Sequence, residues 1–263
     1  MEVRNYGMVD ALERKELDKA RKRLDQGLAN LSRRDGAPPL MWEMAYTDTL
    51  VALMELVLNR NEVINLTSIT EPEEFVELHF LDSLACIGMS ELNEAKRIID
   101  VGSGLGFPGL PLAMLYPEKQ FLLTDSLQKR MEFAAFAAAS FGLGNVDVLH
   151  ARAETAGHDP ALREQFDLTL CRAVGPLPVI LEYCLPFLRV GGAGLFYKTV
   201  QAEEEIEDSV IARRLLGGSA EVRVTEYADL LPGRKHAIYT VFKEKHTPEK
   251  YPRREGIPAK APL

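Results

Sequence analysis

Apolar residues recur at helical spacing through the first third of the chain. From residue 42 to residue 58 they form one broad face, which predicts an amphipathic helix. A second helix is expected to begin at Glu71-Pro72, because proline is tolerated in a first turn and acidic side chains suit the positive end of the helix dipole. It runs to about Met89. Residues 1–36 are rich in charge and predict either a charged helix or a mobile extension.

After Lys96 the pattern changes to short β-rich runs that alternate with helical ones. Strands are expected at 97–101, 119–124, 145–149, 166–171, 192–198, 219–227 and 236–243. Helices are expected between them at 108–116, 127–141, 160–164, 176–188 and 201–216. Such alternation is typical of an α/β fold with a parallel sheet and right-handed crossovers. The last two strands lie close to a turn at 231–235, so they can pair antiparallel at one edge.

The composition is that of a soluble protein that buries its own core. Of the 263 residues, 46% are hydrophobic and 27% are charged. Cys86, Cys171 and Cys184 are far apart and form no CxxC pair, so neither a disulfide framework nor a metal site is expected. No apolar run approaches the roughly 20 residues of a membrane span, and the charged N-terminus does not resemble a signal peptide. We therefore expect a cytoplasmic protein without a membrane partner.

Charge is distributed unevenly along the chain. The net charge of -8 argues against nucleic-acid binding, yet residues 233–263 carry eight Lys/Arg against three Asp/Glu. Residues 1–36 carry nine against seven, so the acidic excess lies in the middle. Prolines disfavour helix in the tail and keep it extended, so Arg253 and Arg254 could follow an RNA backbone. The alternative is a proline-ordered strap that packs on the domain.

The candidate ligand-binding residues are most concentrated between Arg97 and Gly109, where the sequence reads RIIDVGSGLGFPG. A short apolar run leads to Asp100, a turn with four glycines follows, and a second apolar run ends at Asp125. Strand, acid, Gly-rich turn, helix, strand and acid in this order predict a nucleotide-type cofactor at the carboxyl edge of a parallel sheet. The glycines let the backbone approach the ligand and adopt positive φ.

Two cofactors compete for this turn. Residues 104–109 satisfy the G-x-G-x-x-G pattern of dinucleotide sites, but the strand ends before that hexapeptide begins. Read from Asp100 through Gly102 and Gly104, the turn resembles the first motif of S-adenosylmethionine-dependent methyltransferases. An acid there suits an ammonium and a sulfonium and would repel a pyrophosphate, whereas Asp125 suits ribose hydroxyls in both cases. A Gly-rich turn without a ligand is the third possibility.

Further candidate residues follow the later strands. Ala153 and Glu154 come after the third strand, beside the expected adenine edge of the cofactor, although an exposed helix cap is the alternative. Arg172 follows the fourth strand and could contact a cofactor carboxylate or an RNA phosphate, or form a surface ion pair. Lys198 lies at the end of the fifth strand, so the same contacts are considered for its side chain. A lone His79 is more often structural than catalytic, and no nucleophile arrangement or metal cluster emerges.

Seven motifs of this chain resemble those of one family. They are Asn65-Leu-Thr-Ser, His79-Phe-Leu-Asp-Ser, Asp100-Val-Gly-Ser-Gly-Leu-Gly-Phe-Pro-Gly, Asp125-Ser-Leu-Gln-Lys-Arg, Arg152-Ala-Glu, Cys171-Arg-Ala-Val and the tail from Tyr251 to Pro262. Over residues 42–262 the chain resembles the bacterial 16S rRNA (guanine-N7) methyltransferases, also called glucose-inhibited division protein B. The resemblance implies a Rossmann-like, S-adenosylmethionine-dependent methyltransferase fold with an antiparallel last strand, a helical N-terminal portion, and methyl transfer to guanine N7 in the 530 loop of 16S rRNA.

The resemblance also implies residue roles, and the patterns and charges along the chain predict RNA contacts and a division into parts. The cofactor contacts that it implies are Gly102, Phe107, Ala153, Glu154 and Arg172, to which the motif logic adds Asp100, Gly104 and Asp125. Contacts to the RNA of the small ribosomal subunit are expected at Lys129, Arg130, Lys198, Arg253 and Arg254. The expected parts are a charged extension at 1–36, a helical segment at 37–95, a methyltransferase domain at 96–245 and a basic tail at 246–263. Residues 1–36 have no recognised counterpart in the family.

Guanine N7 is a lone-pair acceptor in the major groove and carries no proton. Methyl transfer to it needs no general base, which agrees with the missing catalytic dyad. The rate would come from in-line placement of the two reactants, which can lower a barrier by roughly 7–11 kcal/mol. Two other functions stay open from sequence, an NAD-dependent oxidoreductase and a non-catalytic RNA-binding or ribosome-assembly factor.

Overall fold

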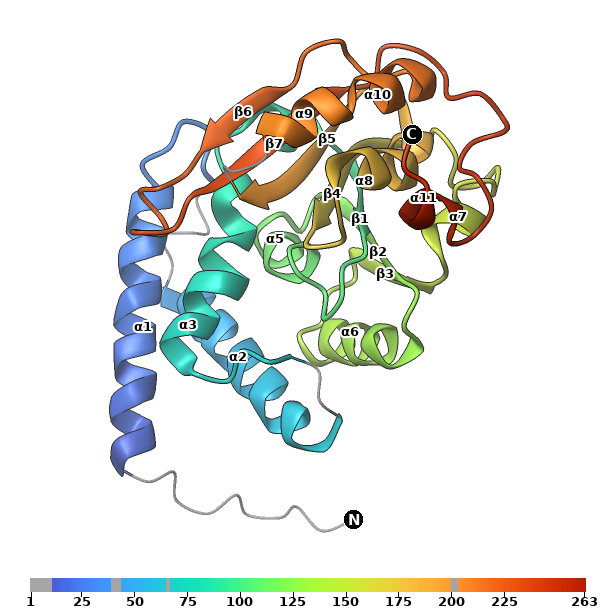
Figure 1. Cartoon of the computed structure of the whole chain (residues 1–263). Helices are drawn as coiled ribbons and strands as arrows, with labels where there is room; N and C mark the ends of the chain where they lie inside the picture. The colour runs from blue at the N-terminus through green and yellow to red at the C-terminus, as the bar shows by residue number, and fades with distance from the viewer. Residues whose placement is uncertain (1–10, 39–43, 65–66, 200–202) are drawn as a thin grey trace.

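A seven-stranded sheet forms the centre of the molecule. The computed structural model describes residues 11–38, 44–64, 67–199 and 203–263. The strands lie in the order β3-β2-β1-β4-β5-β7-β6 (Figure 1). Their bounds are β1 (Arg97–Val101), β2 (Gln120–Asp125), β3 (Val146–His150), β4 (Phe166–Arg172), β5 (Leu188–Thr199), β6 (Arg223–Glu226) and β7 (His236–Phe242). Strands β1 to β5 pair in parallel and β7 runs antiparallel to both β5 and β6, which confirms the predicted fold class.

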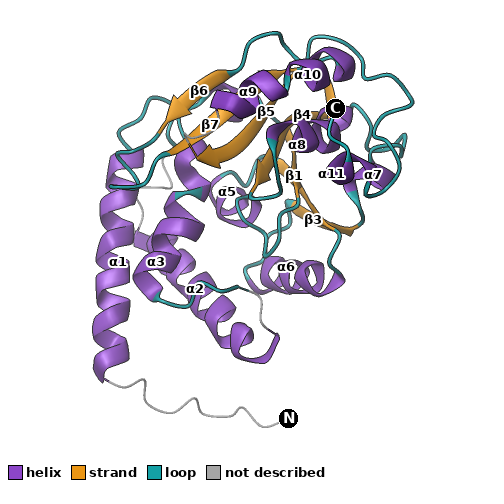
Figure 2. Ribbon diagram, viewed as in Figure 1, coloured by secondary structure: helices purple, strands orange, loops and turns teal. Residues whose placement is uncertain are grey.

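Helices precede the sheet and connect its strands (Figure 2). The α-helices are α1 (Ala11–Leu31), α2 (Met44–Ile64), α3 (Pro72–Phe75), α4 (Ser90–Glu94), α5 (Gly109–Leu115), α6 (Gln128–Ser140), α7 (Ala153–Ala156), α8 (Leu177–Cys184), α9 (Glu203–Asp208), α10 (Val210–Leu216) and α11 (Ile257–Lys260). A π-helical segment η2 (Val76–Leu81) and the 3-10 segments η3 (Ser83–Cys86) and η4 (Leu185–Phe187) complete them. Among the described residues, no helix is long and apolar enough to cross a membrane, and no three His, Cys, Asp or Glu side chains group as a metal site.

Two hydrophobic cores cover the two faces of the sheet. Successive side chains of a strand point to opposite faces, and β1 shows this directly. Ile98 belongs to the core that also contains α1, α2, α5 and α6, whereas Ile99 belongs to the core under α8 and α10. Figure 1 shows the same division, with α1–α3 on one side of the sheet and α8–α10 on the other. Because both faces are covered, the carboxyl edge of the parallel strands is left as the place for a ligand.

Several predicted elements differ from those observed. The helix expected at 160–164 is a series of turns, and the four-residue helix α7 precedes it at 153–156. The helix expected at 201–216 is two helices that separate at Ser209, and residues 201–202 lie outside the described part of the chain. Strand β6 is shorter than the expected 219–227, and β5 begins four residues before the expected start at 192.

The N-terminal charged segment contributes a packed helix. Leu24, Leu28 and Leu31 of α1 are buried in the first core. The Arg23 guanidinium lies 2.9 Å from the Glu77 carboxylate of η2 and also donates to the backbone carbonyl of Leu230. The helix alternative for this segment therefore holds over 11–31, whereas residues 1–10 lie outside the described residues. The four-part division of the chain stays a prediction.

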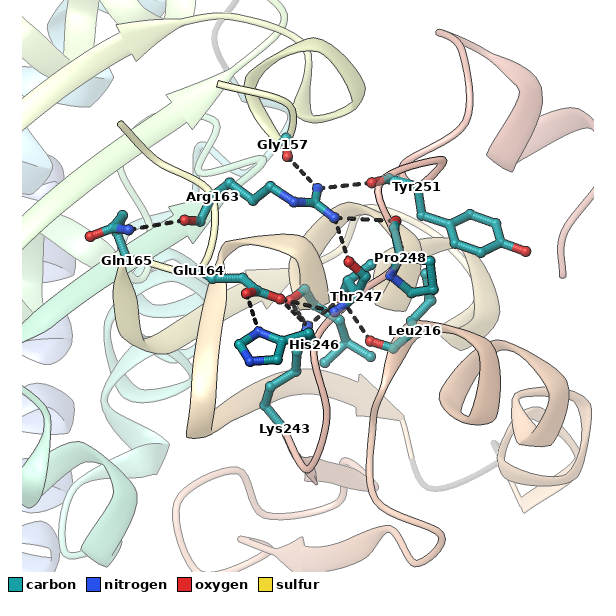
Figure 3. A network of polar contacts seen from close by, with 11 residues as sticks. Gly157, Arg163, Glu164, Gln165, Leu216, Lys243, His246, Thr247, Pro248 and Tyr251 are labelled. Atoms are coloured by element: carbon teal, nitrogen blue, oxygen red, sulfur yellow. Dashed lines mark hydrogen bonds and ion pairs between the residues drawn. The ribbon is translucent and has the colours of Figure 1, made fainter. Parts of the chain in front are cut away.

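Residues 246–257, the C-terminal strap, pack back onto the domain (Figure 3). The Arg163 guanidinium donates to four carbonyl oxygens, those of Gly157, Thr247, Pro248 and Tyr251. Glu164 accepts from the Thr247 backbone at 2.9 Å and from the His246 ring at 2.6 Å. Arg253 pairs at 2.6 Å with Glu182, a carboxylate that is fully buried in α8. The strap is thus fixed to α8 and to the turns between α7 and β4.

Candidate cofactor-binding site

The carboxyl ends of β1, β2 and β4 meet at one edge of the sheet, where two cavities adjoin. The first has a volume of about 310 Å³ and is lined by Asp125 at the end of β2 and by Ala153 and Glu154 after β3. The second has a volume of about 620 Å³ and is lined by the Gly-rich turn with Phe107 and by Arg172. The residues that line both cavities are Gly102, Arg130 and Ala173. The structure therefore gathers the predicted cofactor residues at one edge, as their strand-end positions indicate.

Gly102 needs to be glycine for two reasons. Its φ is +72°, a left-handed conformation that side chains rarely adopt. A Cβ at this position would also lie 2.5 Å from Cγ2 of Val174, in the loop after β4. The turn after β1 and the loop after β4 thus come close at Gly102, which lines both cavities.

Asp125 holds the Gly-rich turn in place. Its Oδ2 accepts a hydrogen bond from the Gly104 backbone at 3.1 Å, and its Oδ1 accepts one from the Leu127 backbone at 2.8 Å. The Arg130 guanidinium lies 3.7 Å from Oδ2. Each carboxylate oxygen has two lone pairs, so Asp125 keeps acceptor capacity toward the first cavity that it lines. Ribose hydroxyls are donors that would use this capacity.

Asp100 is a fully buried carboxylate with one unused oxygen. Its Oδ2 accepts from the Gly109 backbone at 2.8 Å, whereas its Oδ1 has no hydrogen-bond partner among the described residues. Burial raises the pKa of Asp100 to about 7, against the opposing effects of the Gly109 N–H and the Arg172 charge. A buried unpaired acceptor is costly, so this oxygen fits a cationic donor such as the ammonium of S-adenosylmethionine. The residues present therefore fit that cofactor.

Glu154 connects the first cavity with the C-terminal strap. Its side chain is almost fully buried, and its Oε1 accepts from the backbone N–H of Gly256 at 2.9 Å. Beside it, Arg152 forms a 3.1 Å ion pair with Glu255. Of the two alternatives at this motif, an exposed helix cap is wrong for Glu154, because its carboxylate is enclosed between α7 and the strap. The strap thereby supports the wall of the cavity where the adenine was expected.

Arg172 belongs to a polar network whose partners the sequence did not identify. Its guanidinium lies 3.1 Å from the Asp82 carboxylate and 3.2 Å from Nδ1 of His79. Asp82 also accepts from the Tyr227 hydroxyl at 2.7 Å and lies 2.9 Å from Nδ1 of His236. Burial alone raises the pKa of Asp82, but the hydrogen bond from His236 and the Arg172 charge outweigh it, so the pKa is lowered. The surface ion pair considered for Arg172 is therefore a buried one.

The ring of His79 stacks on Phe107, with centroids 4.8 Å apart and planes 21° from parallel. Burial and the nearby Arg172 charge lower the pKa of His79 to about 3, so the imidazole is neutral at pH 7. Phe107 itself is buried and contributes to the wall of the second cavity. His79 and Asp82 lie in the predicted helical segment with its His-Phe-Leu-Asp-Ser motif, which was the one sequence signal that pointed to this network.

The five candidate RNA contacts are not brought together. Lys129 and Arg130 begin α6 beside the two cavities, with Lys129 exposed. Lys198 lines a third cavity of about 240 Å³ and is engaged by the Glu205 carboxylate at 2.6 Å. Arg253 is paired with Glu182, and Arg254 is exposed on the strap. Their roles toward RNA stay predictions.

The strand order and the Gly-rich turn with its two acids define the class of the protein, a Rossmann-like S-adenosylmethionine-dependent methyltransferase. The sequence profile of the family described as rRNA small subunit methyltransferase G matches residues 47–227. A protein of that name from Alkaliphilus metalliredigens is 44% identical over 214 residues, which cover 81% of this chain and 89% of that protein. Another from Desulfitobacterium hafniense is 46% identical over 204 residues, 77% of this chain and 83% of that one. The chain belongs to this family.

Among solved structures, TYW2 of M. jannaschii in complex with AdoMet superposes with a TM-score of 0.46 at 18% identity, covering 57% of this chain and 70% of that one. The family resemblance that the sequence motifs indicated is confirmed by the profile and the relatives. The NAD-dependent oxidoreductase is not favoured, because the relatives are methyltransferases and the buried Asp100 carboxylate would oppose a pyrophosphate.

Proposed function

We propose that this enzyme transfers the methyl group of S-adenosylmethionine to N7 of a guanine in the 530 loop of 16S rRNA, in the cytoplasm. The observation that carries the cofactor assignment is Oδ1 of buried Asp100, which has no hydrogen-bond partner within the described part of the chain. Membership of the small subunit rRNA methyltransferase G family supports the RNA assignment.

Each end of the cofactor has matching groups in the two cavities. Asp125 would hold the ribose, and Ala153 with Glu154 would form the wall beside the adenine. Asp100, which is buried and accepts from the Gly109 backbone of the Gly-rich turn, would take the ammonium, and Arg172 lines the second cavity with its positive charge. The bound cofactor supplies an electrophilic methyl group on a sulfonium. The protein contributes fixed positions for the groups on either side of that methyl.

The proposed chemistry requires no proton acceptor from this chain. Guanine N7 would form the new bond through its own lone pair while the methyl–sulfur bond breaks and S-adenosylhomocysteine leaves, so placement rather than acid-base catalysis would lower the barrier. The loop after β4, with Ala173 and Val174, lies against Gly102 and lines the first cavity. Arg130 is half-exposed and lines both cavities, and the neighbouring Lys129 is exposed, so both side chains suit RNA phosphates.

The test is methyl transfer from tritiated S-adenosylmethionine to small ribosomal subunits that lack the modification, followed by mapping. N7 methylation makes guanine cationic, so the product should become sensitive to cleavage by borohydride and aniline at one position. Label on adenine, on cytosine or on protein would refute the substrate assignment. Unlabelled RNA with intact cofactor binding would favour the assembly factor instead.

The cofactor assignment has its own test in Asp125→Ala. Loss of the acceptor should weaken S-adenosylmethionine binding by about 1–3 kcal/mol, because ribose hydroxyls lose their partner in a partly buried site. Calorimetry with adenosine as a second ligand provides the control, since adenosine carries the same ribose and should lose a similar free energy. Unchanged affinity for both ligands would remove Asp125 from the site.

A further inference from the structure

The hydroxyl of Thr67 lies at the second cavity, next to a histidine whose hydrogen bonds have a fixed direction. Thr67 Oγ1 is 3.2 Å from Nε2 of His79 and 3.1 Å from the backbone nitrogen of Ile69. On the other side of the ring, Nδ1 of His79 is 3.2 Å from Nη2 of Arg172. All these residues except Ile69 line the second cavity.

Arg172 determines where the proton of His79 resides. A guanidinium has only donors, so Nδ1 of His79 must be the acceptor in their contact. The ring is neutral, since its pKa is lowered to about 3 by burial and by the Arg172 charge. A neutral imidazole carries one proton, which is then on Nε2. His79 therefore donates to Thr67 Oγ1, and the stack on Phe107 holds the ring in that direction.

Thr67 is left with a donor and no acceptor capacity. A hydroxyl has two lone pairs and one hydrogen. The lone pairs are used by Nε2–H of His79 and by N–H of Ile69. The hydroxyl hydrogen has no acceptor among the described residues, and the Thr67 backbone is held by the side chain of Asn61 at 2.8 Å and 3.0 Å. A positioned hydrogen-bond donor thus lies at the cavity wall.

We propose that the Thr67 hydroxyl donates to the α-carboxylate of S-adenosylmethionine, and that Arg172 enforces this direction through His79. The inference rests on the proposed cofactor. Among the described residues, those that line the second cavity include Arg130 and Arg172 but no Asp or Glu, so the cavity is complementary to an anion. Because Asp100 suits the ammonium and Asp125 the ribose, the anionic carboxylate is the group of the cofactor that suits this cavity and its two arginines.

The proposal is tested with Thr67→Val and a series of ligands that differ at the amino-acid end. Valine keeps the shape and removes the donor. We expect calorimetry to show about tenfold weaker binding of S-adenosylmethionine, the loss typical of a hydrogen bond to a charged group. Decarboxylated S-adenosylmethionine keeps the ammonium, and 5′-methylthioadenosine lacks both groups, so both should bind the variant as they bind the wild type. Thr67→Ser, which keeps the hydroxyl, should restore the affinity.

Equal losses with all three ligands would show that Thr67 only supports the fold and would overturn the proposal. Unchanged S-adenosylmethionine affinity with a raised KM for RNA would overturn it as well, because the donor would then serve the substrate. These binding measurements need no methyl transfer, so a failure of the proposed rRNA activity would leave their outcome intact and would be seen separately.

His79 is a positioning residue in this scheme, and His79→Phe tests it. Phenylalanine keeps a ring to stack on Phe107 but cannot donate to Thr67. We expect a loss of S-adenosylmethionine affinity similar to that of Thr67→Val, and no further loss in the double variant, because both changes remove the same interaction. Additive losses in the double variant would show that His79 does not act through Thr67.

Discussion

Asp100→Asn should make the free protein more stable above neutral pH. The pKa of Asp100 is about 7 in the folded protein, whereas in the unfolded chain it has the ordinary aspartate value of 3.8. The folded state therefore binds a proton that the unfolded state has released between these values, so the free energy of unfolding falls as pH rises from about 4 to 7 and is level above. One pKa unit corresponds to 1.36 kcal/mol, so ionised Asp100 costs about 4 kcal/mol above pH 7.

The substitution removes this cost and introduces a smaller one. The Asn side-chain oxygen can still accept from the Gly109 backbone. The Asn amide group would occupy the position of Oδ1, which has no partner among the described residues, and leaving its hydrogens unpaired costs about 1–3 kcal/mol. The variant should thus gain about 1–3 kcal/mol at pH 8 and gain nothing, or lose stability, at pH 5.

Urea unfolding without cofactor, from pH 5 to pH 8.5, measures the difference between Asp100→Asn and the wild type. The difference should grow by about 3 kcal/mol over this range. A difference that does not change with pH would refute the reasoning. Cofactor binding adds a second readout: an ammonium beside Asp100 favours the ionised carboxylate, so the wild type should release a proton on binding near pH 7 and the variant should not.

Two further changes test the packing around the site. Gly102→Val should abolish measurable S-adenosylmethionine binding in calorimetry, because φ is +72° and the new side chain would meet Val174; retained affinity would refute the tight contact. Arg253→Ala should lower the free energy of unfolding by about 3 kcal/mol, because buried Glu182 loses its partner, whereas Arg254→Ala, at an exposed position, should change it little. If Arg253 instead contacts RNA, its loss should flatten the salt dependence of RNA binding by roughly 0.7 in slope without a change in melting temperature.

Local patterns predicted those parts of the fold that local interactions determine. Strand β1 begins and ends as expected, and β2, β3 and β4 lie within a residue of their predicted bounds, because short apolar runs between turn signals are strong indications of buried strands. The predicted helix at 160–164 failed because Arg163 is held by carbonyls of the distant strap rather than by a helical pattern. The break at Ser209, whose backbone and side chain bond within α9 and α10, likewise has no signal in hydrophobic spacing.

The candidate site shows the same limit. Asp100, Gly102 and Asp125 could be proposed as cofactor residues from sequence because motif and strand end coincide within one βαβ unit. Asp82 could not, since the partners that give it a role, Tyr227 and His236, are 145 and 154 residues away along the chain. Periodicity says which face a residue occupies, but not which distant segment covers that face.

The docking of α1 has a consequence for the order in which the chain folds during synthesis. Arg23 contacts Glu77, which follows it by 54 residues, and also Leu230, which follows it by 207. At about 5–20 residues per second, the first partner is made roughly 3–11 s after Arg23 and the second roughly 10–40 s after it. The apolar side of α1 therefore has η2 to pack against well before β6 and β7 exist. The N-terminal helices can therefore pack together first, and the later strands of the sheet then pack against the surface that these helices form.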